Sequence, residues 1–213
     1  MNACGCLIGV ALALAPIGVR ASDRADLSVA GTIMPSSCEA FVRGGQLDLG
    51  VIHFADLNPD ETQPTHLVDK ENKLDILCNG PARFALGATD LSDGGGNGRN
   101  FFGLGLGSND KSIGHITISE RNDGFMADGK RAYLTATEDR ELWFASSKSP
   151  IPFSQADYLL GLNKTEGSSA GPDFVRQASM WLFIPVTIAP KADLVPGDEL
   201  VLAGNVLFEI KYL

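Results

Sequence analysis

The side chains in this chain best suited to bond formation or metal binding are its cysteines and histidines. Cys38 and Cys78 lie 40 positions apart, so they can either form a disulfide or contribute to a metal site. A zinc site needs about four ligands at close spacing, and His53, His66 and His115 are not spaced near the two cysteines. The pattern therefore favours a disulfide, provided that the chain is exported to an oxidising compartment.

The first residues of the chain predict export. Residues 6–19 form an apolar stretch that is too short to span a bilayer. The stretch leads into Val19-Arg20-Ala21 before Ser22, the small-x-Ala pattern expected before a signal-peptide cleavage site. We therefore expect residues 1–21 to be a cleaved signal peptide and residues 22–213 to form a single domain. Closing the 40-residue loop between the two remaining cysteines is expected to contribute about 3–4 kcal/mol.

Other patterns that could carry chemistry lack the context that each reaction needs. No G-x-S-x-G nucleophile motif is present, so no sequence motif supports a hydrolase. The glycine-rich stretches at 93–100 and 103–110 are not followed by a helix, as a phosphate-binding loop requires. The segment 124–131 approaches a nucleotide-binding loop, but Arg131 occupies the position of the Ser or Thr that binds magnesium. The sequence predicts a protein that is not an enzyme and that has no cofactor and no metal.

The charge of the chain also argues against two classes of partner. Its formal net charge is −9, and it contains no run of basic residues. Nucleic acids and anionic lipid surfaces attract basic patches. We therefore expect no nucleic-acid partner and, once residues 1–21 are removed, no membrane span.

The elements that must position these residues are predicted to be strands. Apolar side chains recur at every second position, and no sustained helical pattern was found. The expected strands lie at 26–33, 46–52, 73–78, 83–88, 114–119, 132–137, 141–146, 178–190 and 199–213. Pro185 must lie at an edge, a bulge or a break. Short strands with Gly, Pro and Asn turns predict an all-β antiparallel sandwich with Greek-key topology.

Four segments in a fixed order resemble the subunits of chaperone–usher fimbriae. These are GTIMPSSC (31–38), QLDLGVI (46–52), KLDILCNGPARFALGA (73–88) and a C-terminal strand with the penultimate aromatic Tyr212. The segment 101–118 resembles a fimbrial-like family of exported bacterial proteins that is known only as a domain of unknown function.

The resemblance implies an immunoglobulin-like, pilin-type sandwich that lacks its last strand. In such subunits a disulfide ties the first strand to the second, here through Cys38 and Cys78. A strand from another chain fills the remaining groove. The expected donor arm is 22–33, with Leu27, Val29 and Ile33 as its apolar side chains. The side chains expected to face the groove are Leu200, Leu202, Val206, Phe208, Ile210 and Tyr212.

The resemblance also implies partners and a location. The partners are a periplasmic chaperone, an outer-membrane usher and other fimbrial subunits, and the destination is the periplasm and then a cell-surface fimbrium that contributes to adhesion. The alternative is a self-complete periplasmic module that binds a sugar or another small ligand. The glycine-rich loops around 93–108 leave room for the same chain to supply the missing strand.

Overall fold

A computed structural model describes residues 27–94, 98–120, 124–145, 151–155, 158–197 and 199–213. The chain divides into two compact units, Met1–Met34 and Pro35–Leu213, and each is described separately. The predicted signal peptide lies outside the described residues. In the part of the chain that is described, no helix is both long enough and apolar enough to cross a membrane.

The described part of the first unit, residues 27–34, forms no strand. The strand expected at 26–33 is therefore wrong over residues 27–33, which pair with no described strand. Leu27, Val29 and Ile33 are 90%, 89% and 100% exposed, respectively. The alternating apolar side chains of this segment are thus available to solvent.

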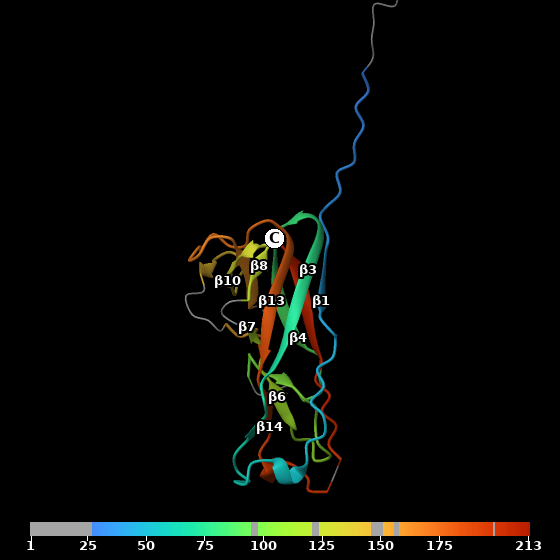
Figure 1. Ribbon diagram of the computed structural model, residues 1–213, viewed down its shortest axis with the longest axis vertical. Helices are drawn as coiled ribbons and strands as arrows, with labels where there is room; N and C mark the ends of the chain where they lie inside the picture. The colour runs from blue at the N-terminus through green and yellow to red at the C-terminus, as the bar shows by residue number, and fades with distance from the viewer. Residues whose placement is uncertain (1–26, 95–97, 121–123, 146–150, 156–157, 198) are drawn as a thin grey trace, which may run out of the picture. The chain divides into compact units, whose positions relative to one another are not determined.

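The second unit consists of antiparallel strands in three sheets (Figure 1). The first sheet has the order β1 (Cys38–Val42), β3 (Lys70–Ala82), β13 (Val175–Ile184), β8 (Met126–Ala127) and β9 (Lys130–Arg131), and β7 (Ser119–Glu120) also pairs with β13. The second has the order β11 (Phe144–Ala145), β10 (Tyr133–Thr137), β12 (Leu159–Asn163), β4 (Phe84–Asp90) and β15 (Val206–Tyr212). The third has the order β2 (Thr65–His66), β14 (Val186–Ile188), β6 (Gly114–Ile116) and β5 (Phe102–Gly103). Two short 3-10 turns, η1 (Phe54–Asp56) and η2 (Lys191–Asp193), complete the described elements.

The first and second sheets pack face to face around one apolar core. Leu74 and Ile76 of β3 point into it from the first sheet, and Phe84 and Leu86 of β4 point into it from the second. Alternate residues of a strand face opposite sides of its sheet, so the period-two pattern of the sequence becomes a buried face. The all-β antiparallel sandwich predicted from the sequence is confirmed.

The strand order matches the immunoglobulin arrangement. β3 and β4 lie in different sheets, although only Arg83 separates them in the chain. The order β1-β3-β13-β8 corresponds to strands A, B, E and D, and β15-β4 corresponds to F and C. In a complete domain strand G pairs with the other side of F, and no described strand occupies that position here.

Pro185 breaks the long C-terminal apolar segment, as the sequence predicted. β13 ends at Ile184, and β14 begins at Val186 in the third sheet. Proline has no N–H to donate, but its carbonyl still accepts a hydrogen bond from the Thr117 N–H, at 3.1 Å. Backbone hydrogen bonding therefore continues past Pro185, and the third sheet begins where the β13 strand of the first sheet ends.

Other predicted strands also need correction. Residues 46–52 do not form a strand, because Gly50 adopts φ +69° and its N–H donates to the Asp48 side chain at 2.8 Å. This local turn interrupts the extended backbone. The final strand covers 206–212 rather than 199–213. Residues 199–205 precede it without forming a described strand.

Candidate functional site

The candidate site is the open side of the sandwich between β1 and β15. Among the described strands, β15 pairs only with β4, and β1 pairs only with β3. Both are therefore edge strands, one in each of the two packed sheets. An edge strand presents unpaired backbone groups that can accept another strand.

The register shows which backbone groups of β15 face the open side. The Leu91 N–H donates to the Asn205 carbonyl at 2.8 Å, and the Leu213 N–H donates to the Arg83 carbonyl at 3.1 Å. Between these two points the hydrogen-bonded positions of an antiparallel pair alternate. The N–H and C=O groups of Val206, Phe208 and Ile210 consequently point away from β4, toward the open side.

A groove of about 840 Å³ lies along this side. One wall is residues 45–52 and the other is residues 199–206, and the two segments run side by side in Figure 1. The floor is apolar. Ile116 and Ile188 lie in the third sheet, and Leu182 and Ile184 belong to β13 of the first sheet. The remaining floor residues lie in the segments between strands: Leu57, Leu104, Ile113, Ile118 and Leu194. The groove is therefore an opening into the interior of the sandwich.

Charged groups are sparse in the groove and lie at its rim. Of the described residues that line it, only Asp48 and Glu199 carry a charge, and the Asp48 carboxylate accepts the Gly50 N–H. The charges of β15 lie on its other face, where Lys211 donates to Glu209 at 2.9 Å. This hydrogen bond and the positive charge of Lys211 lower the pKa of Glu209. The groove thus presents an apolar surface, suited to apolar side chains.

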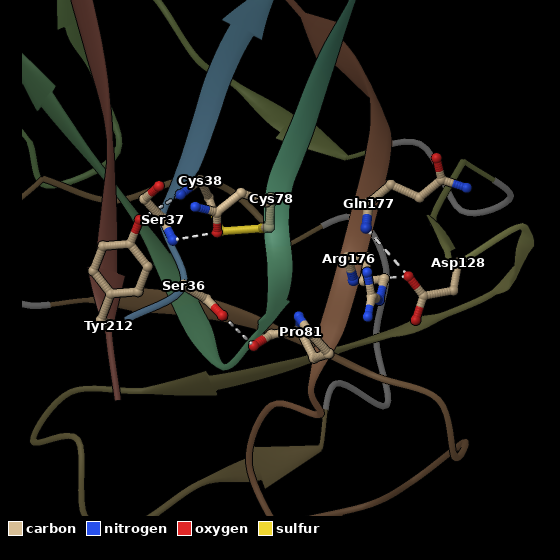
Figure 2. Close-up of a disulfide and its surroundings, with 10 residues drawn as sticks. Ser36, Ser37, Cys38, Cys78, Pro81, Asp128, Arg176, Gln177 and Tyr212 are labelled. Carbon is tan, nitrogen blue, oxygen red and sulfur yellow. Dashed lines mark hydrogen bonds between the residues drawn. A yellow bond between two sulfur atoms is a disulfide. The ribbon is translucent and has the colours of Figure 1, made fainter. Parts of the chain in front are cut away.

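The groove is closed at one end. Its lining stops at Val42 of β1 and Phe208 of β15. Beyond that point the Cys38 N–H donates to the Tyr212 hydroxyl oxygen at 2.6 Å (Figure 2). This hydrogen bond joins the two edge strands directly.

The predicted disulfide between Cys38 and Cys78 is confirmed and lies at the same end (Figure 2). It joins β1 to β3 at directly opposed positions, with a Cα–Cα distance of 3.9 Å. Two further contacts hold the approach to β1: the Ser37 N–H donates to the Asn79 side chain, and the Ser36 hydroxyl donates to the Pro81 carbonyl, both at 2.9 Å. The start of β1 is thus fixed firmly against β3.

The structure brings together only some of the residues predicted to face the groove. Leu200, Leu202, Val206 and Phe208 line it, whereas Ile210 packs against the main core and Tyr212 forms the closed end. The predicted arm residues belong to the other unit. The opposite wall was not predicted as part of the site: Leu47, Leu49 and Ile52 line it. Their apolar spacing in QLDLGVI was the available signal, but it indicated a paired strand.

One family model matches part of the chain. A family model described as a protein of unknown function, DUF1120, matches residues 27–97. The match covers about a third of the chain, including both disulfide cysteines. No curated protein and no solved structure matches the chain. The fold is therefore defined by its own strand order: an immunoglobulin-like sandwich with no described strand in position G.

Removing the disulfide is expected to destabilise the fold without changing it. Replacing both cysteines, Cys38→Ser with Cys78→Ser, should lower the free energy of unfolding by about 3–4 kcal/mol, because the unfolded chain regains the freedom of a 40-residue loop. Urea unfolding followed by circular dichroism measures this loss. The wild-type chain in a reducing agent should show a similar loss. An unchanged unfolding midpoint in the double variant would contradict the stabilising role of the disulfide.

The open groove is expected to bind an apolar dye. Leu202→Asp places a carboxylate in the groove wall and should reduce the fluorescence of bound anilinonaphthalene sulfonate several-fold, because the charge opposes entry of the dye into an apolar site. Leu207→Asp is the matched control: Leu207 lies nearby on β15, does not line the groove and is 43% exposed. Equal fluorescence from the two variants would show that the dye binds elsewhere.

Proposed function

We propose that this chain is a structural fimbrial or fimbrial-like subunit whose sandwich is completed by a strand from another chain. The observation that carries the proposal is the unfilled strand position beside β15, directly over an apolar groove. The predicted export of the chain and its resemblance to fimbrial subunits agree with this role. In this role the chain serves assembly and adhesion rather than catalysis.

Strand addition would use both the unpaired backbone groups of β15 and the apolar groove beside them. The backbone groups of Val206, Phe208 and Ile210 supply main-chain hydrogen bonds, which give affinity without regard to sequence. The groove accepts every second side chain of the incoming strand, which gives specificity. Each large apolar side chain that becomes buried contributes about 1.5–3 kcal/mol. Several such side chains are needed, because association itself costs about 4–15 kcal/mol.

The proposed partners follow from this mode of binding. A periplasmic chaperone would protect the open edge before assembly, an outer-membrane usher would organise export, and other fimbrial subunits would supply or receive the donor strand. Residues 22–33 are the proposed donor arm. Leu27, Val29 and Ile33 provide its apolar alternation, and they are almost fully exposed.

A second function is favoured by the size of the groove. A volume of about 840 Å³ falls within the range of small-ligand pockets, so a self-complete periplasmic binding module is the competing proposal. The sparse charge and apolar floor favour an apolar ligand over a sugar. This function requires a soluble monomer whose melting temperature rises when ligand is added, whereas the fimbrial proposal requires a strand from another chain.

A pair of proline substitutions tests strand addition. Val206→Pro removes an N–H that points to the open side, so stability should change little, while affinity for a synthetic peptide of residues 22–34 should fall about tenfold. Leu207→Pro removes an N–H that faces β4 and should instead lower the free energy of unfolding. Fluorescence anisotropy and urea unfolding measure the two effects.

Co-expression with a fimbrial chaperone gives a second test of the proposal. Co-expression with a fimbrial chaperone should convert an aggregated or unstable chain into a soluble complex on size exclusion, because the chaperone covers the open edge. Deletion of residues 22–30 should leave this capture intact and abolish self-association. A stable monomer that is indifferent both to that deletion and to the chaperone would contradict the proposal.

A further inference from the structure

We infer that Tyr212 closes one end of the groove and so determines where an inserted strand must stop. This inference rests on the proposed function, since it concerns the strand that the groove accepts. It assigns Tyr212 a positioning role: the side chain limits the length of the bound segment instead of contributing an apolar contact to it.

The hydrogen bond to Tyr212 uses the Cys38 N–H, a backbone donor that would otherwise face an inserted strand. The Asn79 N–H donates to the Ser37 carbonyl and the Arg43 N–H donates to the Lys73 carbonyl, which mark the hydrogen-bonded positions between β1 and β3. Hydrogen-bonded positions alternate along an antiparallel pair, so Cys38, Ala40 and Val42 direct their backbone groups away from β3. The Cys38 N–H therefore points to the open side, where the Tyr212 hydroxyl already accepts it at 2.6 Å.

The same contact leaves no space for a further strand at this end. A strand added to β15 lies about 4.8 Å from it in the plane of the sheet. In Figure 2 the Tyr212 ring extends from β15 toward the start of β1. The ring and its hydroxyl thus occupy the position that the added backbone would need. This agrees with the groove lining, which ends at Val42 and Phe208 before it reaches Cys38 and Tyr212.

The closure is rigid because the Cys38 N–H donor and the Tyr212 hydroxyl acceptor are both held in place by neighbouring strands. The disulfide and the contacts of Ser36 and Ser37 fix the start of β1 against β3. Tyr212 is the last residue of a strand that pairs with β4 along its whole length. An inserted strand can therefore run along residues 200–210 toward Tyr212 but must leave the groove before passing it.

The test compares two peptides that differ only in length. The first is the synthetic segment of residues 22–34, SDRADLSVAGTIM. The second carries Thr-Val-Thr-Val added at each end, so that it reaches past Tyr212 in either direction. Their affinities for the full mature chain are measured by fluorescence anisotropy. The variants are Tyr212→Phe, which removes only the hydroxyl, and Tyr212→Ala, which also removes the ring. Tyr133→Phe is the matched control on β10.

We expect Tyr212→Ala to bind the long peptide about tenfold more tightly than the wild-type chain does, with the short peptide unchanged. Tyr212→Phe keeps the ring and should show a smaller gain, and Tyr133→Phe should show none. Amide hydrogen exchange of Cys38 in the free chain should be at least tenfold faster in Tyr212→Phe, because the N–H loses its acceptor.

Each contrary result has a distinct meaning. If the wild-type chain and Tyr212→Ala bind the long peptide equally well, Tyr212 does not limit the strand, although strand addition still holds. If exchange of the Cys38 amide is unchanged, the closure is absent in solution and the inference is overturned. If neither peptide binds any of the chains, the inference and the proposed function both fail.

Discussion

The structure depends on one unmet requirement: among the described strands, β15 has a neighbour on one side only. Its inward side chains, Val206, Phe208 and Ile210, pack against the main core, while the backbone groups of the same residues face the open side. Unpaired backbone beside apolar surface is unfavourable in water and promotes association. The arrangement therefore makes sense as one half of an interaction, and the remaining features of the open side limit what can complete it.

Those limits come from different parts of the chain. The break at Pro185 sends β14 into the third sheet, which supplies part of the groove floor. The turn at Gly50 leaves residues 46–52 as a wall instead of a strand. The disulfide holds β1 where Tyr212 can reach it. A sandwich with these features is open along a defined length and closed at one end, which is more specific than an unprotected sheet edge.

The sequence was sufficient to predict the sandwich, the disulfide and the break at Pro185, because each depends on local pattern or composition. It was misleading at residues 46–52 and 199–205, where alternating apolar side chains indicated strands. The alternation there has the expected purpose, since those side chains face an apolar groove, but pairing also needs a neighbouring backbone. The contact between Tyr212 and Cys38 joins residues 174 positions apart, so it depends on the final packing and has no local signal.

The described residues form two apolar clusters, and members of both line the groove. The larger lies between the two packed sheets, and the smaller is centred on Leu104, Ile113 and Val186 near the third sheet. Regions with separate cores tend to open independently, each as its own cooperative unit. A strand lying along residues 200–210 would contact both clusters at once. Its binding would then join two folding units into one, so that occupancy of the groove could be read from the cooperativity of unfolding.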